Sequence, residues 1–216
     1  MIEATYIDHM GSDLTVANSA RVSFGKKSEM EDDPWGPPRL KKKDDKLIRY
    51  LAKHKHISPF GHCFASFHIK APIFVARQLV KHKFLRWNEI SRRYTTENIE
   101  FYVPDVWRGQ SQDKKQGSDG VIPDIHIETS QLIPMRLYEG LLDKGVCEEQ
   151  ARMVLPQNTM TEWYWSGSLD AFADMCNLRC KPDTQAETRQ VARQIDHKMI
   201  ELFPVAWDAL TDNHDD

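Results

Sequence analysis

The most unusual group of side chains that could do chemistry in this sequence lies in one stretch, residues 77–94. It holds six lysines and arginines and one histidine against a single acid, Glu89, with aromatic and amide side chains between them. Lysine and arginine attract phosphate, arginine through paired hydrogen bonds, while amides and the Ser91 hydroxyl can bond a heterocycle. The stretch therefore predicts a binding site for a phosphorylated, ring-containing ligand. A solvated basic surface is the simpler alternative.

The charge of the whole chain limits what this basic stretch can bind. The 216 residues carry 29 basic and 32 acidic side chains, a formal net charge of -3. Proteins that bind nucleic acid usually have a basic excess over the whole domain, so we expect no nucleic-acid partner, and a single-stranded nucleic-acid binder is the weaker alternative. Another alternative is a magnesium-dependent nucleotide phosphohydrolase, which needs clustered carboxylates. Asp32-Asp33 and Asp44-Asp45 lie in a polar segment, where solvation explains them.

Cysteine and histidine spacing indicates neither a metal site nor a disulfide framework. No C-x-x-C or H-E-x-x-H pattern occurs, and His54 and His56 would diverge at the end of an expected helix. No apolar run approaches the roughly 20 residues that span a membrane, and the N-terminus has no basic region followed by an apolar core. We therefore expect a cytoplasmic protein with no metal ion and no membrane partner.

The elements that must position the basic stretch follow from the spacing of apolar residues. Residues 63–70 alternate in polarity, with Ala65, Phe67 and Ile69 on one face, as in a half-buried strand. Helices and strands mix without a strict βαβ alternation, which favours a mixed α/β (α+β) domain. The expected strands cover 2–8, 63–70, 98–103 and 159–166; the expected helices cover 13–22, 46–55, 73–84, 124–144, 148–155, 168–179 and 183–203.

Two polar segments are expected to be loops. Residues 25–46 contain three prolines and a run of charges, and residues 108–123 are polar and contain glycine. Asp44 or Asp45 is expected to cap the helix that follows the first loop.

The 77–94 stretch resembles the signature of the flavin-dependent thymidylate synthase family. That signature is Arg-His-Arg, seven residues and Ser, and here the frame is Lys81-His82-Lys83, seven residues and Ser91. Lysine keeps the charge at the two replaced positions but loses the planar fork of arginine. The same stretch also matches at Arg77, Gln78, Asn88, Glu89, Arg93 and Tyr94. Segments 10–24, 56–62, 67–78, 151–156 and 177–179 resemble the family in the same order.

The resemblance implies a fold and an activity. The fold is a single domain over 1–216, mixed α/β with a mostly antiparallel sheet flanked by helices, and with a mobile insertion at 26–43. The activity is reductive methylation of dUMP to dTMP, with methylenetetrahydrofolate as carbon donor, FAD as hydride carrier and NADPH as reductant. The implied assembly is a homotetramer whose active sites are shared between subunits.

The resemblance also implies the residues of each site. The implied dUMP residues are Gln78, Leu79, Val80, Lys81, Glu89, Ile90, Ser91, Arg92, Arg93, Arg152 and Arg179. The implied FAD residues are Ser58, Lys81, His82, Lys83, Glu89, Ser168, Leu169, Asp170 and Asp174.

Arg179 is the implied catalytic residue. It would stabilise the uracil ring ionised at N3, which pushes electron density towards C5, and it would act by charge because a guanidinium stays protonated. Ser91 would position the nucleotide without attacking it. The other class of thymidylate synthase adds a cysteine thiolate from a Pro-Cys-His motif, and no cysteine here follows a proline.

Overall fold

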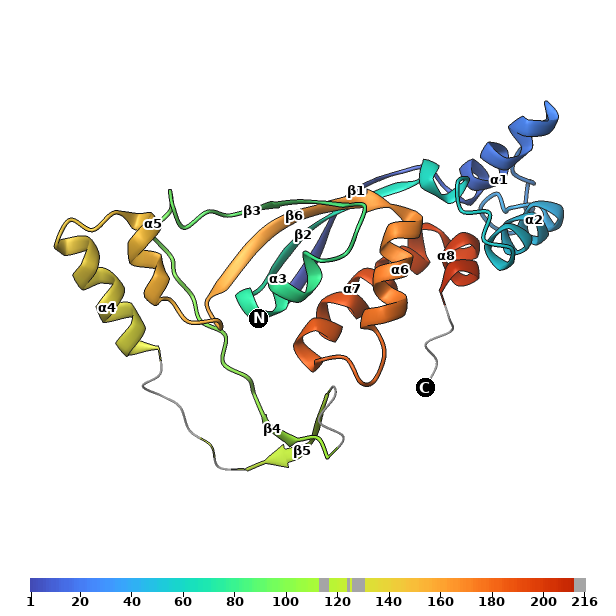
Figure 1. The fold of residues 1–216 in the computed structure, drawn as a ribbon. Helices are drawn as coiled ribbons and strands as arrows, with labels where there is room; N and C mark the ends of the chain where they lie inside the picture. The colour runs from blue at the N-terminus through green and yellow to red at the C-terminus, as the bar shows by residue number, and fades with distance from the viewer. Residues whose placement is uncertain (113–116, 124, 126–130, 212–216) are drawn as a thin grey trace.

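The computed structural model describes residues 1–112, 117–123, 125 and 131–211. A four-stranded antiparallel sheet in the order β1-β2-β6-β3 lies at its centre (Figure 1). Its strands are β1 (Glu3–Met10), β2 (Phe64–Pro72), β6 (Met160–Ser168) and β3 (Leu85–Glu89); a separate hairpin joins β4 (Trp107–Gln110) to β5 (Ser118–Ile122). The expected mixed α/β class with a mostly antiparallel sheet is confirmed.

The two central strands, β2 and β6, are amphipathic. Phe67, Trp163 and Trp165 are fully buried on the face that the helices cover. On the opposite face the hydroxyls of Ser66 and Ser166 bond each other at 2.8 Å. The alternation predicted for the β2 segment is confirmed, because successive side chains of a strand point to opposite faces.

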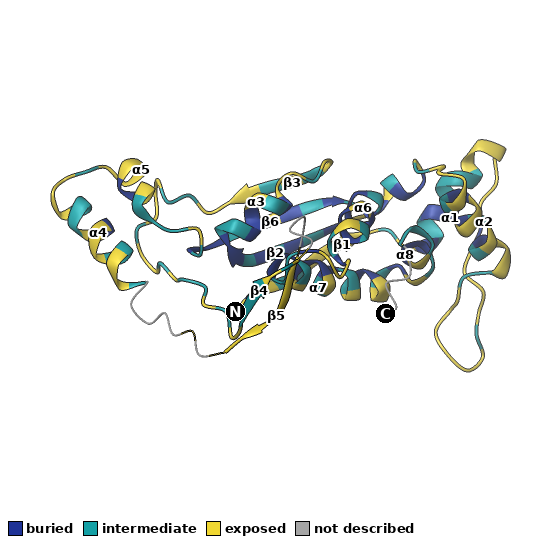
Figure 2. Ribbon diagram, turned by 60° about the horizontal axis from the view of Figure 1, so that its bottom comes forward, coloured by how far each residue is buried: buried dark blue, intermediate teal, exposed yellow. Residues whose placement is uncertain are grey.

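The helices lie mainly on one side of the sheet. They are α1 (Asp13–Arg21), α2 (Lys42–Lys53), α3 (Ile73–Leu79), α4 (Leu132–Asp143), α5 (Glu148–Ala151), α6 (Leu169–Arg179), α7 (Ala186–Leu202) and α8 (Pro204–Leu210). α3, α6 and α7 cover one face of the sheet, α1, α2 and α8 cluster at one end, and α4 with α5 projects at the other (Figure 1). Burial is concentrated between the sheet and its covering helices, while α4, α5 and the loop before α2 are largely exposed (Figure 2). No helix in the described part of the chain is long and apolar enough to cross a bilayer.

Several expected boundaries are wrong. The helix expected over 73–84 ends at Leu79, because the chain turns into β3, which was not expected. The expected strand at 98–103 is reduced to one bridge between Phe101 and Thr159. The expected loop at 108–123 contains most of the β4–β5 hairpin.

Helix ends differ as well. The helix expected over 124–144 is described only as α4, since residues 124 and 126–130 lie outside the described residues. Pro204 follows α7, as expected, but it also begins α8. The carboxylate of Asp13 accepts the backbone N–H groups of Val205 (3.0 Å) and Ala206 (2.8 Å), so a residue from the start of the chain caps this last helix.

The start of the loop before α2 is held in place. Ser28 is buried and exchanges hydrogen bonds with the Asn18 side chain, while its hydroxyl donates to Asp44 at 2.5 Å. Asp44 or Asp45 was expected to cap α2, and this is wrong: α2 begins at Lys42, both acids lie inside it, and the Asp44 carboxylate is fully buried against Arg21. The acid therefore ties α1, the loop and α2 together.

Candidate active site

Arg179, the last residue of α6, lies against the C-terminal end of α3. Its Nε donates to His82 Nε2 at 3.0 Å, and its Nη2 donates to the Gln78 carbonyl at 3.4 Å. The Gln78 side chain donates in turn to Gln185, which precedes α7. The segment 78–82 thus holds the guanidinium directly, and Gln185 holds the Gln78 side chain.

The charge on Arg179 is not neutralised by this environment. Burial, and then the positive charge of Arg179, lower the pKa of His82 to about 4, so the imidazole is neutral at pH 7 and its Nε2 accepts. Burial also lowers the pKa of Arg179 from its ordinary value, although a guanidinium stays protonated. Among the described residues no carboxylate forms an ion pair with Arg179. The cluster offers a half-buried positive charge to a ligand.

A second group of basic residues lines a pocket of about 430 Å³ beside β3 and β6. Arg92, Arg93 and Arg152 enter it together with the Ser91 hydroxyl. Ser91 Oγ accepts from the Arg93 backbone and side chain at 3.3 and 3.4 Å, and Arg92 bonds the carbonyls of residues 97 and 98. None of the three guanidinium groups takes part in an ion pair within the described ranges. We name this cavity the arginine pocket.

Glu89 supplies the one carboxylate among the residues that line the arginine pocket. Its Oε1 accepts the Thr161 hydroxyl at 2.6 Å, and its Oε2 accepts the Trp87 indole N–H at 3.1 Å. Ile90 continues the pairing with β6, because its N–H donates to the Glu162 carbonyl at 2.9 Å. The strand and its neighbours therefore fix the acid at the rim of the pocket.

The turn between α3 and β3 carries the exposed Lys81 and Lys83. It ends at Phe84, a non-glycine residue with φ +64°, in the left-handed region that side chains disfavour. Gly167 of β6 allows this turn to approach, since a Cβ there would overlap a methyl group of Leu85. Backbone strain held in this way often marks a functional turn.

Some of the residues expected to hold the flavin, Ser58, Ser168, Leu169, Asp170 and Asp174, fall around the N-terminus of α6, whereas Lys81, His82, Lys83 and Glu89 lie in the turn before β3 and on β3. Ser168 precedes α6, and Asp170 and Asp174 follow on it at a spacing of one turn. Burial, and then the nearby Asp170, raise the pKa of Asp174. Asp170 Oδ1 is buried without a hydrogen-bond partner in the described part of the chain. Ser58 is exposed, in the turn before the short 3-10 helix Phe60–His62 that contacts α6.

The structure brings the expected residues together in separate groups. Gln78 and His82 meet Arg179, while Glu89 and residues 90–93 meet Arg152 in the arginine pocket. Leu79 and Leu169 are fully buried in the core, main chain included, and Val80 is half exposed. The sequence alone did not indicate Thr161 or Gln185. Thr161 bonds Glu89, 72 residues away in the chain, and Gln185 bonds Gln78, 107 residues away.

Comparisons with known proteins show the family of the chain. The family model for thymidylate synthase complementing protein matches residues 5–205. The flavin-dependent thymidylate synthase of a strain of Thermus thermophilus is 39% identical over 211 residues, which cover 96% of this chain and 74% of the relative. That of Thermotoga neapolitana is 37% identical over 207 residues, covering 94% and 88%.

A solved structure is similar over almost the whole chain. The UMP/dUMP methylase PolB from Streptomyces cacaoi, bound with 5-Br dUMP, has a TM-score of 0.79 at 30% identity and covers 97% of this chain and 94% of its own. The fold and these relatives define an enzyme of the thymidylate synthase type that depends on a flavin. The chain belongs to the flavin-dependent thymidylate synthase family.

Proposed function

We propose that this enzyme converts dUMP to dTMP by reductive methylation, with methylenetetrahydrofolate as carbon donor, FAD as hydride carrier and NADPH as reductant. Family membership supports the reaction type, and the similar methylase binds a brominated dUMP. The observation that carries the proposal is the arginine pocket, which Ser91 lines together with three arginines that have no carboxylate partner in the described ranges.

The arginine pocket suits a nucleoside monophosphate. Arg93 and Arg152 can bind phosphate oxygens through paired hydrogen bonds, which lysine cannot match in geometry. The Ser91 hydroxyl can then hold the nucleotide in place. Glu89, fixed by Thr161 and Trp87, can accept from a sugar hydroxyl or a ring N–H.

Arg179 is proposed to activate the uracil ring. C5 becomes nucleophilic when the base is ionised at N3, and an adjacent positive charge stabilises that form. His82, which is neutral at pH 7, holds the guanidinium without cancelling its charge. No thiolate is needed for this route, and Cys63, Cys176 and Cys180 are buried in the core.

The residues proposed for FAD fit such a group in charge and in hydrogen bonding. Lys81 and Lys83 are exposed cations suited to the pyrophosphate, and Asp170 carries an acceptor without a partner among the described residues. Carboxylates of this kind bind ribose hydroxyls in other nucleotide sites. When bound, the flavin would supply the hydride that reduces the transferred one-carbon unit.

We propose a homotetramer with active sites shared between subunits. Within one chain the Arg179 cluster and the arginine pocket are not joined by any hydrogen bond or ion pair of the described residues. A site completed by a second subunit accounts for this separation.

The reaction can be tested in two steps. Protein loaded with FAD is mixed with NADPH without oxygen, and the flavin absorption should bleach. Addition of dUMP and methylenetetrahydrofolate should then yield dTMP on chromatography. A folded protein whose flavin never bleaches, or which makes no dTMP after bleaching, would contradict the proposal.

A further inference from the structure

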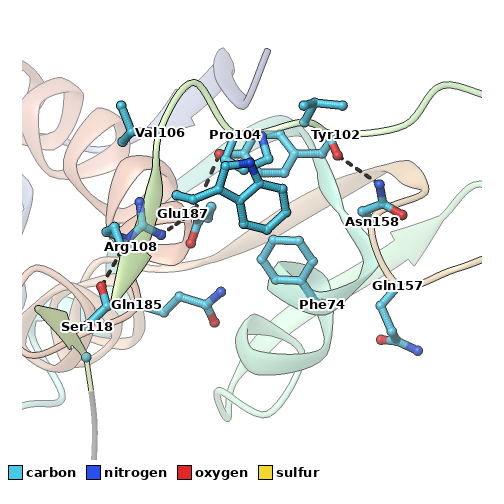
Figure 3. Close-up of a pocket in the computed structure, with 13 residues that line it drawn as sticks. Phe74, Tyr102, Pro104, Val106, Arg108, Ser118, Gln157, Asn158, Gln185 and Glu187 are labelled. Carbon is cyan, nitrogen blue, oxygen red and sulfur yellow. Dashed lines mark hydrogen bonds and ion pairs between the residues drawn. The ribbon is translucent and has the colours of Figure 1, made fainter. Parts of the chain in front are cut away.

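The largest cavity among those described contains none of the residues proposed above for dUMP or FAD. It has a volume of about 670 Å³ and lies between α3, the segment 102–108 and the start of α7 (Figure 3). Asn158 lines it, while the next residue, Thr159, lines the arginine pocket. We name it the aromatic pocket. Its size is in the range of sites that enclose a small organic ligand.

Aromatic side chains form its walls. Phe74 and Tyr102 pack edge to face with ring centroids 6.0 Å apart, and Trp107 lines the same cavity. All three are only partly buried, so ring surface is left uncovered. Partly exposed rings gathered in one cavity favour a flat ligand that can stack on them.

The two charges in the aromatic pocket neutralise each other. Arg108 forms an ion pair with Glu187, and its Nε donates to Ser118 at 2.9 Å. The Tyr102 hydroxyl lies 3.5 Å from Glu187 Oε1 and donates to it. Burial, and then Glu187, raise the pKa of Tyr102 to about 12, so this hydroxyl keeps its proton. The pocket therefore offers no free charge to a phosphate or a carboxylate.

The remaining polar groups are three amides and Glu187 Oε2, a buried acceptor without a partner among the described residues. The side chains of Gln157, Asn158 and Gln185 line the cavity, and an amide both donates and accepts. Gln185 also accepts from Gln78, whose carbonyl holds Arg179. A ligand that touches Gln185 would thus lie two hydrogen bonds from the proposed catalytic guanidinium.

We propose that the aromatic pocket binds an uncharged, planar heteroaromatic ring whose edge carries amide-type donors and acceptors. The ring would stack on Trp107, Tyr102 and Phe74. The three amides would form hydrogen bonds with the donors and acceptors on its edge. The pteridine of a folate, the nicotinamide of NADP and the isoalloxazine of FAD share this chemistry, and the choice of these three sources rests on the proposed function.

The test uses the full chain in its native assembly. Binding of 5-formyltetrahydrofolate, NADP+, FAD and dUMP is measured by calorimetry for the wild type, Trp107→Leu, Gln157→Leu and the control Trp35→Leu. Trp35 is an indole exposed at 96% that does not line the cavity. Trp107→Leu removes a stacking ring. It should weaken the binding of one of the three ring-bearing ligands at least about tenfold. Gln157→Leu should weaken the same ligand, while Trp35→Leu and dUMP binding should be unchanged.

Three results would overturn this assignment. The first is wild-type affinity of both pocket variants for all three ligands, and the second is an equal loss of affinity for the same ligand in the control Trp35→Leu. The third is a smaller assembly of Trp107→Leu by native mass spectrometry, which would make the cavity a subunit contact. The proposed function fails in a different way, by loss of dUMP conversion in the wild type.

Discussion

Arg179 donates to His82, its Nε lying 3.0 Å from Nε2, and this histidine is neutral at pH 7. A carboxylate in the same place would fix the guanidinium but cancel much of its charge. A neutral imidazole fixes its direction and leaves the charge available to a ligand. The arrangement suits electrostatic stabilisation better than it suits a structural ion pair.

Replacing Arg179 with alanine should separate catalysis from folding. We expect dTMP formation at saturating dUMP to fall roughly a hundred- to a thousandfold, since one preorganised electrostatic partner is lost. Stability should fall by at most about 1 kcal/mol, the contribution of a cation at a helix C-terminus. Chromatography of dTMP and thermal unfolding give the two values. Near-normal turnover in Arg179→Ala would show that Arg179 only caps its helix.

The stability of the enzyme should depend on pH through His82. The imidazole binds its proton near pH 6.5 when unfolded and near pH 4 when folded, so its pKa is depressed in the folded state. The unfolded state therefore gains protons first, and folding becomes less favourable as pH falls from about 6.5 to 4. Above pH 7 this histidine should contribute no pH dependence.

The comparison variant for this effect is His82→Gln, which keeps an acceptor for Arg179 but does not titrate. Melting temperatures in a buffer series from pH 4.5 to 8 should fall more steeply below about pH 6.5 for the wild type than for the variant. Two curves that stay parallel down to pH 4.5 would show that the histidine is not held neutral.

The positive charge of Lys81 should matter more for ligand binding than the shape of its side chain. Lys81→Glu should weaken FAD or dUMP binding at least about tenfold, while Lys81→Arg should bind equally well or better, because arginine adds a fork to the same charge. Lys43→Glu makes the same charge change at an exposed position of α2 and should leave both affinities unaltered. Titration of flavin absorption and calorimetry with dUMP provide the measurements.

No cysteine should be needed for turnover. Burial raises the pKa of Cys63 to about 11, so its thiolate is scarce at neutral pH, and burial also raises the pKa of Cys176. Cys147 is exposed, at the N-terminus of α5. Cys147→Ser should keep the full rate of dTMP formation, as should Cys63→Ala if it folds. A folded single variant without turnover would argue for a cysteine nucleophile.

The buried Asp44 should be a major source of stability. Asp44→Asn leaves Arg21 without its anionic partner and weakens the bond from Ser28, and we expect a loss of about 3 kcal/mol in the free energy of unfolding. Asp33→Asn is the matched control, since Asp33 lies 4.0 Å from an exposed Arg39 and should cost under about 1 kcal/mol. Urea unfolding at one fixed protein concentration measures both, and equal losses would contradict the anchoring role.

The sequence by itself determined the elements whose signal is local. Alternation with a period of two marked β2, because every second side chain of a strand enters the core, and a content rich in aromatic residues and threonine marked β6. β3 was missed, since it is an edge strand whose partner in the described sheet, β6, lies more than 70 residues further along the chain. α8, which begins at Pro204, was not predicted, because its cap, Asp13, comes from the opposite end of the chain.

The same division holds for the site. The spacing of Lys81, His82, Lys83 and Ser91 was visible in the sequence, and so was the positive charge around it. Only the tertiary structure decided that His82 meets Arg179, and that the arginine pocket forms a separate group. Residue types and their spacing can be seen in the sequence, whereas contacts between distant residues form only when the sheet and its helices pack. Burial, which sets the pKa of His82, arises in the same step.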